Sequence, residues 1–233
     1  MIYVSSDWHG VSVEDIKRLL RQADFGKDDF LFILGDVIDR GKHGVDLIKY
    51  IMYEPNIELI RGNHEQMLLS CSFLFEEITD SSIAGLTADK MSLFSAWQMN
   101  GGEPTVSGLR YESAETRNEI LEYLSDTPLY DTVSVGGRDF LLVHGGLGND
   151  GEFKSLKECQ PDELLWSRPY IDTEYSRDFM TVLGHTPTHY YGSEYRGKIL
   201  IRETWIDIDT GAACGLSPSL LRLDDMKAFY LSD

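Results

Sequence analysis

Residues 31–41 read LFILGDVIDRG, and this stretch decides the fold. Its apolar run ends in Gly35, and the polar residues Asp36, Asp39 and Arg40 follow. A buried parallel strand has this pattern, because its carboxyl end delivers polar side chains onto a loop that a ligand can reach.

Two segments of the same kind flank this stretch. Residues 2–10 read IYVSSDWHG and place Asp7 and His9 behind an apolar run, and residues 57–65 read IELIRGNHE and place Asn63 there. The carboxyl ends of neighbouring parallel strands meet at one edge of a sheet. The three segments therefore predict one metal site that is assembled from successive loops.

The segments between these strands have helical periodicity. Apolar residues recur every three or four positions over 12–24 and over 43–53, and Ser12 is an expected N-cap. Strands at 2–7, 30–35 and 57–61 alternate with these helices. Alternation of this kind is typical of parallel βαβ units and of the α/β class.

The middle and the end of the chain have different patterns. Residues 66–128 read mostly as helix, interrupted by Gly101-Gly102 and Pro104, and we expect a helical insert that caps the site. A hairpin turning at Gly136-Gly137 follows. Further strands are expected at 179–184 and, as an antiparallel run, at 198–203, 205–209, 219–223 and 228–231. Without a repeat or a linker, residues 1–233 are predicted to form a single domain.

The formal net charge of −18 argues against a nucleic-acid partner or an anionic membrane surface. Three scattered cysteines fit a reducing compartment, and no apolar stretch is long enough to span a membrane. The chain begins with a strand pattern and lacks a leader pattern, so a cytoplasmic protein is expected. The sequence does not indicate an oligomeric state.

Six residues at or just past the ends of expected strands form a candidate ligand set: Asp7, His9, Asp36, Asn63, His144 and His185. Mixed carboxylate, imidazole and amide ligands suit manganese, iron, zinc or cobalt. Six ligands are too many for one catalytic zinc, which takes about three protein ligands. Two ions that share a carboxylate would use all six, and such a pair activates water for direct attack on a phosphoester. Neither G-x-S-x-G nor C-x-x-C, which would indicate a nucleophilic serine or a redox cysteine pair, occurs in the chain.

Five motifs together resemble the PPP-type serine/threonine phosphatases of the calcineurin-like metallophosphoesterase superfamily. They are D-x-H-G at 7–10, G-D-x-x-D-R-G at 35–41, G-N-H-E at 62–65, H-G-G at 144–146 and G-H-T at 184–186. The chain is most similar to the bacterial and phage branch that includes lambda phosphatase. That branch shares GNHEQM at 62–67, a W-x-R segment at 166–168 and I-D-T-G-A at 208–212.

This resemblance implies a central β-sandwich of two mixed sheets flanked by helices, with a bound pair of divalent ions, for which manganese is the expected metal and iron, zinc or cobalt are alternatives. It implies that Asp7, His9 and Asp36 hold the first ion. The ligands implied for the second ion are Asp36, Asn63, His144 and His185. The implied catalytic residues are His64 as general acid, Asp39 as its partner, and Arg40 and Arg168 as phosphate clamps. In this scheme Arg40, Asn63, His64 and Arg168 contact the substrate phosphate.

Several alternatives stay open. Residues 144–148 read HGGLG, which departs from lambda phosphatase and leaves the loop contacts near the substrate unpredicted. Taken singly, each motif residue has a structural explanation in a turn or the core. Arg168 could simply stack on Trp166, and a turn role is expected for Asp209. The acidic loop 147–163 and the insert shape a rim that the sequence does not define.

Three functions are consistent with these motifs. The first is a phosphatase acting on phosphoserine and phosphothreonine in phosphoproteins or on small phosphorylated substrates. The second is a phosphoanhydride hydrolase of the symmetrical diadenosine tetraphosphatase type, which shares the five motifs. The third is a non-catalytic binding module, in which some of the metal ligands would be missing.

Overall fold

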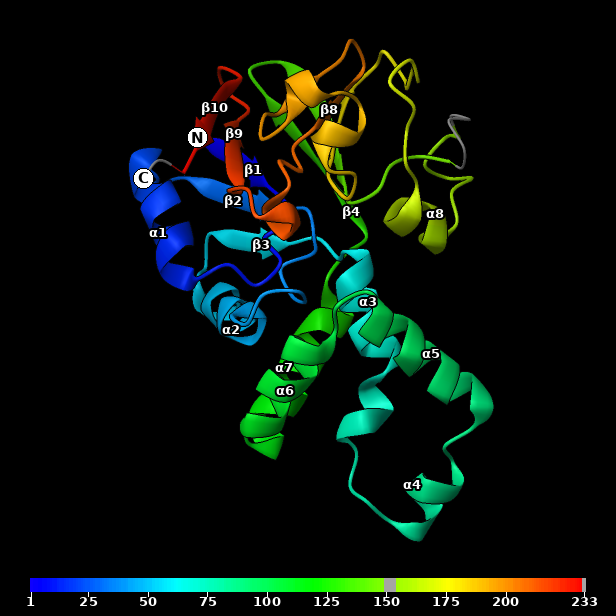
Figure 1. Ribbon diagram of the computed structural model, residues 1–233. Helices are drawn as coiled ribbons and strands as arrows, with labels where there is room; N and C mark the ends of the chain where they lie inside the picture. Colours follow the sequence, from blue (N-terminus) through cyan, green and yellow to red (C-terminus); the bar gives the residue numbers. More distant parts are fainter. Residues whose placement is uncertain (149–153, 232–233) are drawn as a thin grey trace.

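The computed structural model describes residues 1–148 and 154–231, and two five-stranded mixed sheets lie at the centre of this part of the chain (Figure 1). The first sheet has the order β10–β9–β1–β2–β3, formed by Lys227–Tyr230, Ser219–Arg222, Ile2–Ser5, Phe30–Ile33 and Ile57–Leu59. The second has the order β4–β5–β6–β8–β7, formed by Tyr130–Val135, Arg138–Val143, Met180–Leu183, Trp205–Asp207 and Leu200–Ile201. The predicted fold class is confirmed.

Helices follow the strands and form the insert. Their bounds are α1 Val13–Gln22, α2 Gly44–Tyr53, α3 Asn63–Ser70, α4 Asp80–Ala84, α5 Ala88–Met99, α6 Glu103–Tyr111, α7 Ala114–Asp126 and α8 Pro161–Trp166. Short 3-10 turns lie at η1 Ser72–Phe75, η2 Thr188–Tyr190, η3 Ser193–Tyr195 and η4 Ala212–Cys214. No helix in the described ranges has the length and apolar character that crossing a bilayer requires.

The alternation of side chains along each strand builds the layers. Phe32 and Leu142 point between the two sheets, where they join one apolar core. Leu31 faces the opposite way, into the core beneath α1 and α2. On the outer face of the second sheet, Leu141 and Trp205 pack under α8 and the loops around it. Full burial of one such side chain contributes about 1.5–3 kcal/mol.

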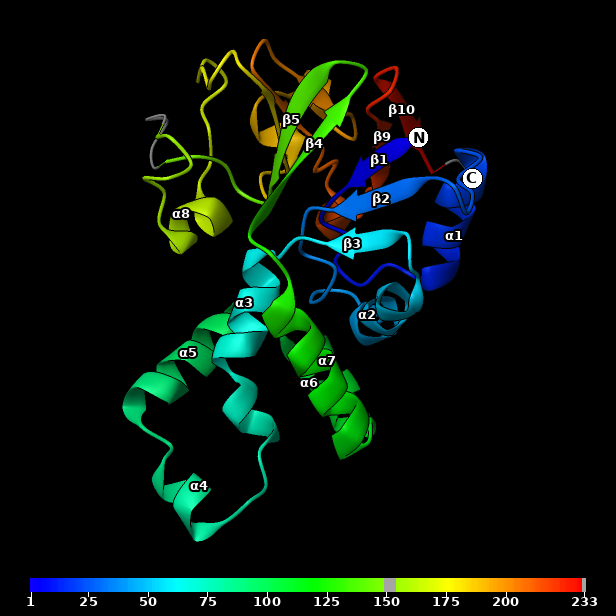
Figure 2. The same cartoon turned by 180° about the vertical axis from the view of Figure 1, so that it is seen from behind.

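The insert runs between β3 and β4, so it lies where the chain passes from one sheet to the other (Figure 2). Helix α6 packs against α2, and α3 packs against both α5 and α7. Helix α4 lies at the end farthest from the sheets (Figure 1).

One expectation needs correction. The strands expected to form one antiparallel run at 198–231 are divided, because β8 joins β6 in parallel whereas β9 pairs with β1 in the other sheet. The expected interruption at Gly101-Gly102 and Pro104 is present between α5 and α6, and Pro104 occupies the first turn of α6, where its missing N–H leaves no hydrogen bond unmade. The helical insert, expected from about residue 66, begins with α3 at Asn63. Residues 149–153 of the acidic loop lie outside the described part.

The predicted N-cap of α1 can be tested by mutation. The Ser12 hydroxyl accepts the Asp15 N–H at 3.1 Å, as the sequence predicted. Replacing Ser12 by alanine should lower the free energy of unfolding by about 1 kcal/mol, measured by urea denaturation. The matched variant Ser12→Asn keeps a capping oxygen and should stay near the parent value. Equal stability of the alanine variant and the parent would contradict the cap.

Candidate metal centre

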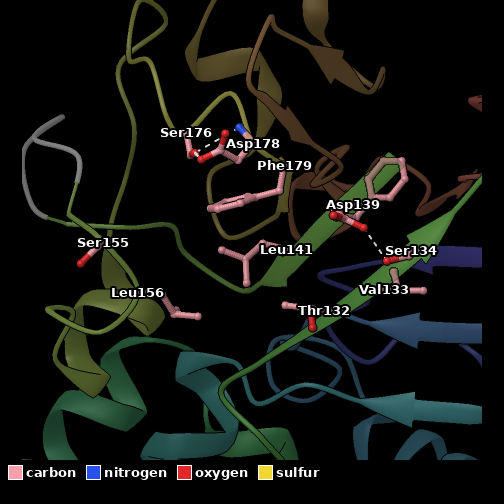
Figure 3. Close-up of a pocket in the computed structure, with 11 residues that line it drawn as sticks. Thr132, Val133, Ser134, Asp139, Leu141, Ser155, Leu156, Ser176, Asp178 and Phe179 are labelled. Atoms are coloured by element: carbon pink, nitrogen blue, oxygen red, sulfur yellow. Dashed lines mark hydrogen bonds between the residues drawn. The ribbon is translucent and has the colours of Figure 1, made fainter. Parts of the chain in front are cut away.

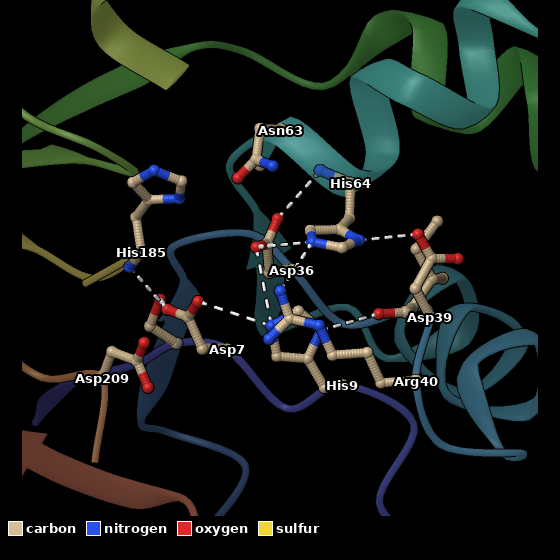
Figure 4. Close-up of polar contacts among 12 residues, drawn as sticks. Asp7, His9, Asp36, Asp39, Arg40, Asn63, His64, His185 and Asp209 are labelled. Carbon is tan, nitrogen blue, oxygen red and sulfur yellow. Dashed lines mark hydrogen bonds and ion pairs between the residues drawn. The ribbon is translucent and has the colours of Figure 1, made fainter. Parts of the chain in front are cut away.

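The loops after the parallel strands bring the candidate ligands together, as expected. Asp7 and His9 follow β1, Asp36 follows β2 and His185 follows β6 (Figure 4). His144 follows β5. The sixth residue, Asn63, opens helix α3 instead of lying on a strand loop. All six side chains are buried, so the two sheets and the insert each contribute to one interior cluster.

Asp36 is shared by two groups of potential ligand atoms. One group is His9, Asp36 and His64, the other is Asp36, His144 and His185, and the ligand atoms of each group lie within 4.8 Å of one another. Asp36 Oδ2 is 3.7 Å from His9 Nε2, and Asp36 Oδ1 is 3.4 Å from His144 Nε2. The arrangement fits a pair of ions with Asp36 between them. The first group thus includes His64, which was predicted to be the acid, whereas the predicted ligand Asp7 lies beside this group, with its Oδ1 3.8 Å from His9 Nε2.

Backbone carbonyls fix the proton on two of the imidazoles. His9 Nδ1 lies 3.1 Å from the Ile38 carbonyl, and His144 Nδ1 lies 2.6 Å from that of Leu34. A carbonyl only accepts, so each Nδ1 carries the hydrogen and each Nε2 keeps a lone pair for the cluster. Burial, the largest cause, lowers the pKa of His9 to about 3, so that its imidazole is neutral as a metal ligand must be.

Unpaired acceptors show that the cluster suits a cation. His185 Nε2 is buried and has no hydrogen-bond partner in the structure. His144 Nε2 faces Asn63 Oδ1 at 2.8 Å, although both atoms are acceptors in this arrangement. A buried acceptor without a donor is unfavourable, and a divalent ion would satisfy all three atoms at once. The donor set therefore fits the metal pair that the sequence implies.

The loops that carry these side chains have strained backbones. Six non-glycine residues of the site have positive φ: Asp7, His9, Asp36, Asp39, Arg40 and His185. Each such conformation costs about 1–3 kcal/mol and persists only where its surroundings enforce it. The buried Glu65 carboxylate is one constraint, because it accepts the N–H groups of Asp36 at 2.8 Å and Val37 at 2.9 Å.

Two glycines let the loops approach. A Cβ at Gly62 would lie 2.3 Å from Asp36 Oδ1, and a Cβ at Gly35 would lie 2.4 Å from Gly62 Cα. Gly35 also has a φ of +84°. The glycines in these two motifs therefore serve the close contact between the loops after β2 and β3.

Asp39 and His64 form a buried pair at the edge of the cluster. Asp39 Oδ2 is 2.6 Å from His64 Nδ1 and also accepts the Trp97 indole N–H at 2.7 Å. Burial raises the pKa of Asp39 to about 7, and hydrogen bonds from Thr105 and Trp97 oppose that rise. Sequence reasoning gave Trp97 no role. Its apolar helical context gives no sign of this polar contact.

The two arginines occupy different positions. Arg40 Nη2 lies 3.3 Å from His64 Nε2, on the cluster. Arg168 donates to the His185 carbonyl and to the Thr186 hydroxyl, both at 3.1 Å. Trp166 packs edge-on against the His185 ring at 5.8 Å between centroids. Arg168 is thus held by the loop after β6.

Asp209 is a further carboxylate of the site. Its Oδ1 accepts the Gly211 N–H at 2.9 Å, so the expected turn role is confirmed. It is also buried beside Asp7 (Figure 4). Burial, followed by the Asp7 charge, raises its pKa well above the usual range. The turn signal gave no indication of this proximity.

The HGG segment at 144–146 packs the loop after β5 against α8. The Gly145 N–H donates to the Leu164 carbonyl at 2.7 Å, and a Cβ at Gly145 would lie 2.9 Å from the Leu165 backbone. Gly145 thus lets the loop after β5 pack directly on this helix.

A separate pocket of about 560 Å³ lies against the β4–β5 hairpin (Figure 3). Thr132, Leu141, Leu156 and Phe179 are among its lining residues, which include none of the six candidate ligands. It is therefore distinct from the polar cluster.

The chain is similar in sequence to a known phosphatase and to known tetraphosphatases. The sequence profile described as calcineurin-like phosphoesterase matches residues 1–210. Serine/threonine-protein phosphatase 2 of Salmonella typhimurium is 24% identical over 223 residues, which are 95% of this chain and 92% of that protein. The symmetrical bis(5'-nucleosyl)-tetraphosphatase of Haemophilus ducreyi is 26% identical over 175 residues, 73% of this chain and 54% of that protein. The chain thus spans about half the length of the tetraphosphatase.

Solved structures agree on the fold. A crystal structure provisionally described as a diadenosine tetraphosphatase superposes with a TM-score of 0.65 at 16% identity, covering 98% of this chain and 91% of that one. A protein serine/threonine phosphatase of Saccharomyces cerevisiae superposes with a TM-score of 0.56 at 16% identity, covering 100% and 80%. At these identities the superpositions support the fold alone.

The contact between the β2 and β3 loops predicts an effect on metal binding. Gly62→Ala should displace Asp36 and lower the affinity for Mn²⁺ by roughly 10–100-fold, the range seen when the support of a ligand is lost. Isothermal titration of the metal-free protein measures this affinity. The matched control is Gly26→Ala, whose Cβ would meet only Asp29 Oδ2 at 3.9 Å. Unchanged affinity in the Gly62 variant would show that this contact does not govern the site.

Proposed function

The chain belongs to the calcineurin-like phosphoesterase family, and we propose that it is a protein phosphatase of the PPP type that hydrolyses phosphoserine and phosphothreonine monoesters. At the level of the family, it is a metal-dependent phosphoesterase. The observation that carries the proposal is the pair of buried ligand groups joined through Asp36. As in the sequence prediction, residues 1–233 act as one domain in this proposal.

The proposed ligands divide between two ions. Asp7, His9 and Asp36 would hold the first, and Asp36 with Asn63, His144 and His185 the second. Bound divalent ions would supply Lewis-acid activation of water and of the phosphoryl oxygen. Manganese suits this mixed oxygen and nitrogen set, as do iron, zinc and cobalt.

The remaining roles belong to the chain itself. His64 donates a proton to the leaving oxygen, and Asp39 holds its imidazole at 2.6 Å in the required orientation. Arg40 lies 3.3 Å from His64 and can bind phosphate oxygens beside it. Arg168, held by the loop of His185, is the second phosphate-binding arginine in this proposal.

Coverage favours a protein phosphatase over the alternative. The match to the Salmonella phosphatase extends over 92% of that protein, whereas the match to the Haemophilus tetraphosphatase extends over 54%. The dinucleotide hydrolase nevertheless remains the second candidate, since it shares the five motifs. A binding module would have a broken ligand set, but the expected ligands and His64 are all present here.

A substrate comparison tests the proposal. With Mn²⁺ added, the protein should release phosphate from a phosphoserine peptide with a higher kcat/KM than it shows toward diadenosine tetraphosphate. Phosphate release and chromatographic separation of the nucleotides give the two rates. Preference for the dinucleotide would select the second candidate. Absence of turnover with every divalent metal and both substrates would reject both enzymatic functions.

Two substitutions separate proton transfer from metal binding. His64→Asn should lower kcat by roughly 10²–10⁴-fold, the usual contribution of a general acid. Its metal content, measured by elemental analysis, should stay at the parent value. Asp36→Asn should instead lose bound metal, because it removes the shared carboxylate charge. Full activity of the His64 variant would refute the assignment of the acid.

A further inference from the structure

Two donors from the helical insert hold the Asp39 carboxylate. Trp97 of α5 donates its indole N–H to Oδ2 at 2.7 Å, and Thr105 of α6 donates its hydroxyl to Oδ1 at 2.5 Å. His64 Nδ1 also contacts Oδ2, at 2.6 Å (Figure 4). Both carboxylate oxygens are therefore engaged, and the insert supplies a donor to each.

Burial makes these contacts obligatory. Asp39 and Trp97 are 0% exposed, and Thr105 is 2% exposed. A buried carboxylate without donors is strongly unfavourable, and water has no access to replace a lost partner. Because Oδ2 already accepts the Trp97 N–H, its position relative to His64 depends on where the indole lies.

The insert also holds the backbone at this point. The Thr105 oxygen accepts the Asp39 N–H at 3.0 Å, and the Gly101 carbonyl accepts the Arg40 N–H at 2.9 Å. Asp39 and Arg40 have φ values of +67° and +65°. The insert thus enforces a conformation that the two residues would not adopt alone.

The link between α5 and α6 is shaped for this contact. A Cβ at Gly102 would lie 2.6 Å from Trp97 Nε1, and one at Gly101 would lie 2.8 Å from Arg40 Cγ. Gly101 also has a φ of +95°. The sequence predicted Gly101-Gly102 as a helix break. Because neither glycine has a side chain, this break also allows the insert to contact Asp39 and Arg40.

We propose that Trp97 and Thr105 are positioning residues that act through Asp39 to aim the His64 imidazole at the leaving group. This inference rests on the proposed function, in which His64 is the general acid. The insert then governs proton transfer, whereas bound ions would polarise the phosphoryl group and the arginines bind its oxygens. If this positioning is lost, the rate of hydrolysis should fall most for substrates whose leaving group must be protonated.

Two aryl phosphates with leaving groups of different basicity can be used to measure the contribution of leaving-group protonation. Phenolate is a basic leaving group, with a conjugate-acid pKa of about 10 like that of tyrosine, whereas p-nitrophenolate is far less basic and departs readily. In Trp97→Phe and in Thr105→Val, kcat for phenyl phosphate should fall by roughly 10–100-fold, part of the full general-acid effect. The kcat for p-nitrophenyl phosphate should fall much less, and both KM values should stay near the parent value. Thr105→Ser restores a hydroxyl and should recover the phenyl phosphate rate.

Trp205→Phe is the matched control. Trp205 is also buried, and its indole N–H donates to the Thr173 carbonyl at 2.9 Å, away from the ligand cluster. This variant loses a comparable hydrogen bond and should leave the ratio of the two aryl phosphate rates unchanged. Equal losses for both substrates in Trp97→Phe and Thr105→Val would overturn the positioning role, because general loosening of the fold acts on both.

A proton resonance gives a readout that does not require turnover. The His64 Nδ1–H in its 2.6 Å contact with Asp39 should give a low-field ¹H signal, assigned by its loss in His64→Asn. The signal should shift in Trp97→Phe and Thr105→Val and stay in place in Trp205→Phe. An unmoved signal in the first two variants would overturn the inference. If the parent protein hydrolyses no phosphoester, the proposed function fails, but this measurement still decides whether the insert positions His64.

Discussion

The buried carboxylate of Asp36 is the constraint around which the site is built. Its pKa is raised well above the usual range, first by burial and then by the charges of Asp7 and Glu65. Like charges that are withdrawn from water repel one another unless cations or donors compensate them. The backbone N–H of His64 meets part of this requirement, because it donates to Asp36 Oδ1 at 3.0 Å. The inward lone pairs of His9 and His144 do not, so cations are the remaining compensation. A pair of divalent ions would remove most of the repulsion. Metal binding should therefore also stabilise the conformation of these loops.

The ligands come from both sheets, so the packing between the sheets determines whether they meet. Phe32 precedes the loop of Asp36, Leu142 precedes that of His144, and both belong to the apolar core between the sheets. The His144 imidazole also contacts the Leu34 carbonyl of the other sheet at 2.6 Å. The geometry of the metal centre is therefore a property of the sandwich and not of any one loop.

The sequence predicted the strand ends well because an apolar run followed by Asp, Asn or His is a local pattern with a direct structural meaning. It did not predict which sheet received β8 and β9, because strand partners are chosen by tertiary packing. The helical character of the insert was predicted, but its contact with Asp39 was not. Trp97 lies in a segment that reads as ordinary core, and only its neighbours in space reveal that its N–H meets a carboxylate.

The insert has an inner part that contacts the site and an outer part that does not. Trp97, Gly101 and Thr105 bind the loop of Asp39 and Arg40, whereas α4 contains no buried residue and Ile78 before it is 84% exposed. Changes in the outer part would therefore leave the loop of Asp39 and Arg40 in place. The inner part has no such freedom, because Trp97 and Thr105 each donate a hydrogen bond directly to the Asp39 carboxylate.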